Sequence, residues 1–505
     1  MIRKILEEKS GYKVWWNGDE RGDYSANVGS AEKAGDVKNG LINDKYISKI
    51  ETEKGFVNFW LSEKALEDGL RFALQEKFDF LKKQKIQVEF ISANPTGPLT
   101  LGNARGGVYG DVLANVLEKC GAKVVKEYYV NDAGNQIEIL GHSILKDDKA
   151  EYAGDYINEL ALRLRSGQAG GPKDVGEKAA EIILDNIKKT AKDMGIDFDV
   201  WFSERKDLRE KGRIDEIVKW LKEKDLAHEK GGALWFKASQ FGDTEDRVLI
   251  KENGEPTYFC ADAAYHKNKF VDRKFDKVIN VWGADHHGDV GRIKGFVEAL
   301  GFSAQLEIIL MQFVRLLENG KAARMSKRKG TYVLVEDVLR EVGKDAFRYF
   351  MLTRSANTHM DFDMDLAKEQ SKKNPVYYIQ YSHARVCSIL NKFEIPASLA
   401  GRRNPKSETI PNIKLLNSKH ERQLILKLIQ IPEVLEDISK DYQAHKLTTY
   451  IYELAKTFTD FYENVRVLEA ESEELKRARL SLVAATRQIL EKVLKLMGIS
   501  APEKM

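Results

Sequence analysis

The hydrophobic pattern is most regular in one stretch of the N-terminal half, where it predicts a strand, a turn, a helix and a second strand. Residues 86–91 are largely apolar and predict the first strand, and residues 92–103 form a turn rich in proline and glycine. From Ala104 the apolar residues recur at helical spacing, and Gly121 is placed to end that helix. Residues 124–130 predict the second strand. Such a βαβ unit presents a helix N-terminus that can bind an anion, although an ordinary crossover has the same pattern.

The rest of the chain divides into regions of different pattern. Residues 66–81 predict an amphipathic helix, and the stretch from about 150 to 245 carries helical patterns. Residues 277–282 and 306–317 predict further strands. From Val338 onward the pattern is helical almost throughout, which favours a separate helical domain after the α/β region.

These patterns predict an α/β protein built around a Rossmann-like parallel-sheet domain. We expect an α+β domain before it and an all-α domain after it. The expected boundaries are residues 1–85 for the N-terminal domain, 86–345 for the sheet domain with a helical insertion at about 150–245, and 346–505 for the helical domain.

Composition limits the possible functions without choosing among them. Hydrophobic residues make up 43% and charged residues 31% of the 505 residues, which fits a soluble globular protein of several domains. The net charge is only +3, so a nucleic-acid surface would have to come from local clustering. Cys120, Cys260 and Cys387 lie far apart and predict neither disulfides nor a zinc site. No apolar run suits a signal peptide or a membrane span, so we expect a cytoplasmic protein without membrane contact.

A basic loop lies at residues 324–330 and has the sequence Arg-Met-Ser-Lys-Arg-Lys-Gly. It makes the turn at residues 92–103 more informative about function. Alone, this loop could be a solvated basic turn. Together, the two stretches resemble the two ATP motifs of class I aminoacyl-tRNA synthetases. Residues 92–98, 129–136 and 374–385 narrow the resemblance to the arginyl-tRNA synthetases.

This resemblance implies an arginine–tRNA ligase, an enzyme that ligates L-arginine to tRNA(Arg) at the expense of ATP. The family implies an arginyl-adenylate intermediate, release of pyrophosphate and AMP, ATP bound with Mg²⁺, and a monomer. It also implies that tRNA must be present for the first step, and that the N-terminal domain contacts the outer corner of the tRNA and the helical domain its anticodon.

The resemblance also assigns residues to ATP. Lys327 and Arg324 are expected to be catalytic, as are Thr100 and Asn103 of the first motif. The expected ATP-binding residues are Gly102, Gly283, Asp285, His286, Met325 and Ser326. The adjacent His286 and His287, together with Asp285, also suggest a metal site. Their spacing does not provide a third well-placed ligand, so we expect no protein-held metal.

The first motif departs from the family at two positions. The usual histidines are replaced by Thr100 and Asn103, which donate hydrogen bonds without positive charge. Arg324 replaces the customary first lysine of the second motif and keeps its charge. We expect an active enzyme. The alternatives are a catalytically impaired tRNA-binding paralogue, or another class I synthetase.

Four residues are assigned to arginine. A guanidinium calls for a planar carboxylate partner, and Tyr258 and Asp262 are four apart and share a face if helical. By resemblance these two bind the guanidinium, while Ser92 and Asn94 hold the α-amino end. The alternative for Asp262 is a surface acid paired with a nearby lysine, Lys267 or Lys269.

Aromatic and polar residues of the helical domain are assigned to tRNA. Residues 377–385 interleave tyrosines, an amide and a cation, a combination that can stack on splayed bases and bind their edges. By resemblance Tyr377, Gln380 and Arg385 face the anticodon together with the final residues up to Met505. Several of these tyrosines could instead be core residues.

Overall fold

The computed structural model describes residues 1–19, 21–164, 170–322, 333–392 and 410–505. These residues form two compact units, one made of Met1–Phe80 with Gln370–Met505 and the other of Leu81–Glu369. No helix within the described ranges is long and apolar enough to cross a membrane.

A five-stranded parallel sheet is the centre of the second unit, and its strand order is β12-β11-β5-β6-β7. Parallel neighbours need crossover connections, which the helices of this unit provide. The sheet therefore has the predicted Rossmann-like character. Its strands are β5 (Lys85–Glu89), β6 (Lys123–Val130), β7 (Val200–Ser203), β11 (Lys277–Gly283) and β12 (Leu306–Met311).

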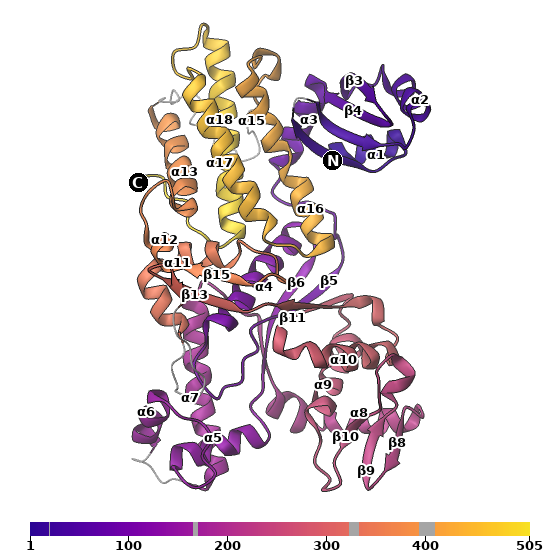
Figure 1. The fold of residues 1–505 in the computed structure, drawn as a ribbon, viewed down its shortest axis with the longest axis vertical. Helices are drawn as coiled ribbons and strands as arrows, with labels where there is room; N and C mark the ends of the chain where they lie inside the picture. Colours follow the sequence, from indigo (N-terminus) through magenta and orange to yellow (C-terminus); the bar gives the residue numbers. More distant parts are fainter. Residues whose placement is uncertain (20, 165–169, 323–332, 393–409) are drawn as a thin grey trace. The chain divides into compact units, whose positions relative to one another are not determined.

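Helices and two small sheets complete this unit (Figure 1). The helices are α4 (Leu101–Lys119), α5 (Asn135–Leu145), α6 (Asp155–Leu164), α7 (Pro172–Asp193), α8 (Arg213–Glu223), α9 (Tyr258–Lys267), α10 (His287–Ala299), α11 (Val335–Met351) and α12 (Met364–Lys368). The small sheets contain β8 (Ala227–Lys230), β9 (Ala233–Phe236) and β10 (Arg247–Ile250), and β13 (Val314–Glu318), β14 (Lys321–Ala322) and β15 (Met360–Asp363).

Three predictions of secondary structure were wrong in part. The stretch predicted as helical between 150 and 245 also contains β7, which is an edge strand of the central sheet, and the β8–β9 hairpin. The strand predicted at 306–317 is two strands that belong to different sheets, because the chain leaves the central sheet after Met311. The mostly helical region after Val338 includes β15, which pairs with β13.

Glycines allow helix α4 to lie against the end of β5. A Cβ on Gly110 would come within 2.4 Å of the Phe90 ring, and a Cβ on Gly107 within 2.8 Å of the Ile91 side chain. A larger residue at either position would push the helix away from the strand. The close approach fixes the helix N-terminus beside the turn that follows β5.

A buried ion-pair network also holds α4 in place. Asp111 accepts from Arg348 Nη2 and from Lys126 Nζ, both at 2.5 Å. Asp111 is 2% exposed and Arg348 is fully buried. Removing one member of such a pair leaves an uncompensated charge in the interior.

We therefore expect Asp111→Ala to destabilise the second unit by about 3–5 kcal/mol, the usual cost of breaking a buried ion pair from one side. A large fall in the midpoint of thermal unfolding would show it. Lys188→Ala is the matched control, because Lys188 pairs with Asp185 on the exposed face of α7 and such pairs contribute little. Equal midpoint shifts in the two variants would contradict the expectation.

The first unit combines a small α+β domain with a helical domain (Figure 1). The α+β part is an antiparallel sheet of order β1-β2-β4-β3 with three helices. Its elements are α1 (Ile2–Ser10), β1 (Val14–Asp19), β2 (Gly22–Asn27), α2 (Ala31–Leu41), β3 (Ile47–Glu53), β4 (Phe56–Leu61) and α3 (Glu63–Ala73). Helix α3 starts earlier than the predicted helix and ends at Ala73 rather than at residue 81.

The helical part is all-α over its described residues, as predicted. Its long helices begin with side-chain caps at Ser418 and Ser472, whose hydroxyls accept from backbone N–H groups of the first turn. The helices are α13 (Pro375–Lys392), α15 (Lys419–Ile429), α16 (Ile431–Asp441), α17 (Lys446–Asn464) and α18 (Glu473–Leu496).

Candidate functional site

A cavity of about 460 Å³ lies where β5, β6 and β11 end at their carboxyl ends. Ligands of open α/β sheets bind at this edge. All four residues assigned to arginine from the sequence line this sheet-edge cavity: Ser92, Asn94, Tyr258 and Asp262. Of the residues assigned to ATP, His286 also lines it.

The turn after β5 enters the cavity with a strained backbone. Ile91 and Ser92 both have positive φ angles, of 66° and 41°, which residues other than glycine rarely adopt. Two bonds to β6 hold this conformation. The Ser92 hydroxyl accepts from the Tyr129 N–H at 3.1 Å, and the Tyr128 hydroxyl donates to the Ala93 carbonyl at 2.7 Å. The strain is thus maintained beside the cavity, where it orients Ser92.

Helix α9 presents Tyr258 and Asp262 on one face, as the spacing predicted. Thr257 caps the helix by accepting from the Cys260 N–H at 3.2 Å. The alternative of a surface ion pair for Asp262 is wrong. Lys269 pairs with Glu89 at 2.5 Å, and Lys267 pairs with Asp272 at 3.6 Å. Within the part of the chain that the structure describes, Asp262 forms no ion pair.

The cavity is strongly acidic around Asp262. Burial, together with the charges of Glu89, Glu204 and Asp289, raises the pKa of the Asp262 carboxyl to about 8, although the charge of Lys269 acts in the opposite direction. All three of these acidic neighbours line the cavity. An acidic carboxyl without a counter-ion, surrounded by other acids, favours a cation at this position.

Two other groups of lining residues complete the cavity wall. Asn131 and Gln136 follow β6, and the Gln136 amide donates to the Asn131 carbonyl at 3.0 Å. On α10, Asp289 bridges His286 Nδ1 at 3.1 Å and Arg292 Nη2 at 2.8 Å. The cavity is therefore lined by polar groups on three sides and closed by the apolar side chains of Ile91, Phe259, Val281 and Trp282.

The start of α4 differs from the expectation for the first motif. The Thr100 N–H donates to Asn103 Oδ1 at 3.0 Å, and the Thr100 hydroxyl donates to the same oxygen at 2.8 Å. The two residues that replace the family's histidines thus bond to each other across the first turn. Gly102, between them, is exposed. The Asn103 amide N–H₂ group remains as a donor to a ligand.

Backbone bonds join the first ATP motif to the described residues that follow the basic loop. The Leu101 N–H donates to the Val333 carbonyl at 3.3 Å, and the Val335 N–H donates to the Leu99 carbonyl at 3.2 Å. The residues just after the basic loop therefore contact the residues that begin α4. The loop residues Arg324, Met325, Ser326 and Lys327 themselves lie outside the described residues.

The third stretch assigned to ATP lies at the end of β11. Gly283, Asp285 and His286 are exposed there, just before α10. The Asp285 carboxylate folds back over Gly283, because a Cβ on Gly283 would lie 2.4 Å from Asp285 Oδ1. A side chain at position 283 would require the exposed Asp285 carboxylate to move. No cluster of three or more potential metal ligands occurs among the described residues.

Of the residues assigned to tRNA, Tyr377, Gln380 and Arg385 lie on α13. Tyr377 and Tyr381 are nearly parallel, at 8°, with centroids 6.3 Å apart, and the Arg385 guanidinium lies 4.8 Å from the Tyr381 ring and 4.7 Å from Tyr462. Tyr377, Tyr381 and Arg385 therefore share one face of α13. Tyr462, on α17, was not predicted to join it.

Gln380 instead contacts the C-terminal segment. Its amide N–H₂ group donates to the Ser500 carbonyl at 3.1 Å and to the Ser500 hydroxyl at 3.0 Å. His383 lies 2.9 Å from the Pro502 carbonyl through Nδ1. These bonds hold the final residues on α13, and Met505 beyond them is 52% exposed.

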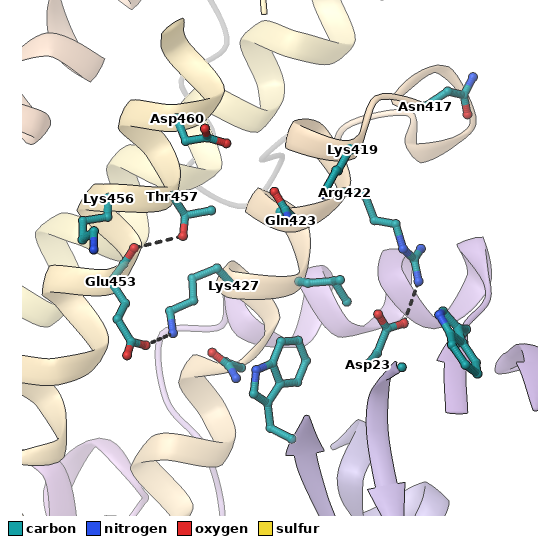
Figure 2. Close-up of a pocket in the computed structure, with 15 residues that line it drawn as sticks. Asp23, Asn417, Lys419, Arg422, Gln423, Lys427, Glu453, Lys456, Thr457 and Asp460 are labelled. Carbon is teal, nitrogen blue, oxygen red and sulfur yellow. Dashed lines mark hydrogen bonds and ion pairs between the residues drawn. The ribbon is translucent and has the colours of Figure 1, made fainter. Parts of the chain in front are cut away.

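A larger cavity, of about 1100 Å³, lies in the first unit (Figure 2). Trp16 and Trp60 of the small sheet form part of its wall, opposite α15 and α17. Its charged residues are largely paired with each other. Asp23 accepts from Arg422 at 2.6 Å, and Lys427 pairs with Glu453. This cavity of the first unit is lined by none of the described residues that the sequence assigned to arginine or ATP.

Four functional candidates in the sheet-edge cavity were not predicted from the sequence: Glu89, Tyr129, Glu204 and Asp289. Glu89 ends β5 and Tyr129 is near the end of β6, so the position of each at the carboxyl edge of the sheet was a usable signal. Glu204 and Asp289 lie at the starts of helical segments, where acids are common for reasons unrelated to ligands.

Comparisons with known proteins match the whole chain. A family model described as "tRNA synthetases class I (R), catalytic domain" matches residues 70–166 and 161–387. A second model, described as "DALR anticodon binding domain", matches residues 379–505.

Individual proteins agree with these models. The arginine–tRNA ligase of Carboxydothermus hydrogenoformans is 44% identical over 486 residues, which cover 89% of this chain and 84% of that protein. The arginine–tRNA ligase of Caldanaerobacter subterraneus is 42% identical, with 91% of this chain and 85% of that protein covered. The solved structure of Thermus thermophilus arginyl-tRNA synthetase shares the fold, with a TM-score of 0.81 at 23% identity and all of both chains covered. Two adjoining family models and relatives of this identity show that the chain belongs to the arginyl-tRNA synthetase family.

Proposed function

We propose that the sheet-edge cavity binds L-arginine and that this chain joins arginine to tRNA(Arg) through an arginyl-adenylate, releasing pyrophosphate and AMP. One observation carries the assignment of the cavity. Asp262 stands without an ion-pair partner, among the described residues, in an acidic cavity at the carboxyl edge of the central sheet. A guanidinium supplies the charge and the planar pair of donors that such a carboxylate lacks.

The arginine side chain would enter with its guanidinium on Asp262 and Tyr258. Glu89 and Glu204 add negative charge around it. Ser92 and Asn94, on the strained turn after β5, would hold the α-amino group at the other end. The arginine carboxylate would then point toward the start of α4, where ATP is expected. Binding of both ends fixes the attacking oxygen, which lowers the entropic barrier of the reaction.

The ATP step needs positioning and charge stabilisation more than covalent chemistry. The carboxylate of arginine attacks the α-phosphorus of ATP, and the bond to pyrophosphate breaks. Gly102 in the first turn of α4 lets the phosphates approach the N–H groups of the helix N-terminus. Lys327 and Arg324 would neutralise the charge that builds on the leaving pyrophosphate. Gly283, Asp285 and His286 would hold the adenosine, and Met325 and Ser326 would position the loop.

Thr100 and Asn103 would support this step without charge. Their bonds to each other cap the first turn of α4 and use Asn103 Oδ1, so the Asn103 N–H₂ group is left to donate to a phosphate. This arrangement favours an active enzyme over the impaired paralogue, with more of the charge stabilisation resting on the basic loop than histidines would allow.

The remaining assignments concern partners. Mg²⁺ would arrive with ATP, because phosphate oxygens and water suit this ion better than a protein cage. The tRNA would lie against Tyr377, Arg385 and the segment ending at Met505, with Tyr462 in the same ring stack. Gln380 would act by holding the C-terminal segment. We further propose a cytoplasmic monomer with three domains, at residues 1–85, 86–345 and 346–505.

The pKa of Asp262 gives this proposal a pH signature. Binding a guanidinium requires the charged carboxylate, and the pKa of about 8 leaves most of it protonated below that pH. Arginine binding is therefore expected to strengthen as pH rises from 6 to 8, by about 50-fold in dissociation constant, and to level off above pH 8. Calorimetric titrations at several pH values would measure it. A pH-independent constant would contradict the role of Asp262, whereas Asp262→Asn should remove the slope.

The proposed function is tested by AMP formation from labelled ATP. We expect AMP to form only when arginine and tRNA are both present. No AMP above background under these conditions would favour the tRNA-binding paralogue, and AMP formation with a different amino acid would favour another synthetase.

A further inference from the structure

Tyr129 lies near the end of β6 and lines the sheet-edge cavity, but neither the arginine nor the ATP assignment uses it. Its side chain is 8% exposed, and its hydroxyl donates to Glu204 Oε2 at 3.0 Å. The other oxygen of Glu204 accepts from Arg209 Nε at 2.9 Å and Nη2 at 2.7 Å. Glu204 is 1% exposed, so this chain of contacts is fixed. The Tyr129 proton is therefore committed to Glu204.

A phenol has one proton to donate and two lone pairs that accept. Because the Tyr129 proton goes to Glu204, its oxygen can only accept from a ligand in the cavity. No other described residue donates to that oxygen. Tyr129 and Asp262, the carboxyl assigned to the guanidinium, both line the cavity, and burial with the charges of Glu204 and Asp262 raises the pKa of Tyr129.

We propose that Tyr129, oriented by Glu204, makes the site selective for a guanidinium over a neutral urea of the same shape. This inference rests on the proposed function. A guanidinium carries only donors, whereas the urea of citrulline puts a carbonyl acceptor in place of one nitrogen. At a position where Tyr129 can only accept, a carbonyl oxygen would face another acceptor and both groups would lose a hydrogen bond. Tyr129 is thus a specificity-determining residue and Glu204 its positioning residue.

The same cavity provides a matched control. Tyr265 is also buried beside a carboxylate, and its hydroxyl donates to Glu127 at 2.6 Å. Its oxygen already accepts from Gln87 Nε2 at 3.3 Å. A protein donor therefore already uses the Tyr265 oxygen as an acceptor, whereas no described residue donates to the Tyr129 oxygen. Tyr265→Phe removes a buried tyrosine hydroxyl from a carboxylate without touching the proposed selectivity.

The experiment compares arginine and citrulline in charging of tRNA, with citrulline measured both as a substrate and as a competitive inhibitor of arginine. Tyr129→Phe is expected to raise the KM for arginine about tenfold, the factor for one hydrogen bond to a charged group, with kcat within about threefold of the original enzyme. The preference for arginine over citrulline should fall by about the same factor. In Glu204→Gln the preference should fall as well, because the new amide donates to the phenol oxygen and frees its proton for the ligand.

Three results would overturn the proposal. The preference could stay unchanged in Tyr129→Phe, or it could fall equally in Tyr265→Phe. It could also fall in Glu204→Gln alone, which would mean that Glu204 acts only through its charge. If Tyr129→Phe does not fold, the preference of Glu204→Gln for arginine over citrulline is the deciding measurement. An unchanged preference in that variant overturns the proposal. If the unmutated enzyme attaches no arginine to tRNA, the proposed function itself is wrong. That result is distinct from an unchanged preference in the variants, which overturns only the role of Tyr129.

Discussion

Replacing Asp262 with asparagine is expected to raise the KM for arginine about 100-fold while the KM for ATP stays the same. The carboxylate would make two charge-assisted hydrogen bonds to the guanidinium, and losing both costs about 3 kcal/mol. The effect falls on arginine alone, because Asp262 is on α9 at the cavity wall and ATP is expected at the start of α4. Steady-state charging kinetics with each substrate varied in turn would measure both constants.

The thermal stability of Asp262→Asn shows whether a raised KM for arginine comes from weaker binding or from a damaged fold. The raised pKa of Asp262 means that its charged form is disfavoured in the folded protein, so above pH 4 folding loses stability as pH rises toward 8. Asparagine carries no such penalty, so the thermal midpoint of Asp262→Asn at pH 8 should not fall below the original. Asp225→Asn, at an exposed ion pair with Lys237, is the control and should change neither KM. An unchanged arginine KM in Asp262→Asn would remove the assignment.

Replacing Lys327 with alanine is expected to lower kcat for adenylate formation by about 100- to 1000-fold. This is the usual loss when a preorganised donor to developing charge is removed. The segment after the basic loop is bonded to the residues that start α4, which supports a loop able to reach the phosphates. With two neutral residues in place of the family's histidines, the first motif supplies no charge to compensate.

The comparison that isolates Lys327 uses a second cation near the loop in sequence. Arg340→Ala removes an exposed charge on α11 that is paired with Asp337, and should leave kcat within about twofold. Lys327→Arg should recover part of the lost rate, because arginine keeps the charge but changes its geometry. Similar rates for Lys327→Ala and Arg340→Ala would mean that the loop does not act on the phosphates.

The sequence predicted those parts of the fold that repeat a regular pattern. The βαβ unit from β5 to β6 was predictable because its strands are apolar and its helix has a clear face and a terminal glycine. Strand β7 was not, because its four residues are too short to show a period, and it becomes a strand only by pairing with β6. Strand β15 likewise depends on its partner β13.

The site shows the same division between local and tertiary information. Tyr258 and Asp262 could be placed on one helical face from their spacing, and both line the cavity. Their acidic surroundings could be predicted only in part, because Glu89 lies near the end of a predicted strand whereas Glu204 resembles any other surface acid in the sequence. Only the fold shows that Glu89 is paired with buried Lys269 and Glu204 with Arg209 and Tyr129, which leaves Asp262 as the group that lacks a counter-ion among the described residues.

The bonded pair of Thr100 and Asn103 shows why a substitution within a motif cannot be judged from its residue types alone. Both residues were expected to point to phosphate as weak replacements for histidine. In the fold they close a cap on α4, so one role of each is structural and the motif is kept in shape without imidazoles.

Charging of total tRNA with each of the labelled amino acids in turn tests the central claim most directly. If the acidic cavity selects the guanidinium of arginine and the chain transfers the arginyl group to tRNA, arginine alone will be attached. Oxidation of the tRNA 3′ end with periodate beforehand will then abolish the signal. Attachment of a different amino acid, or of none while tRNA still binds, would contradict the account.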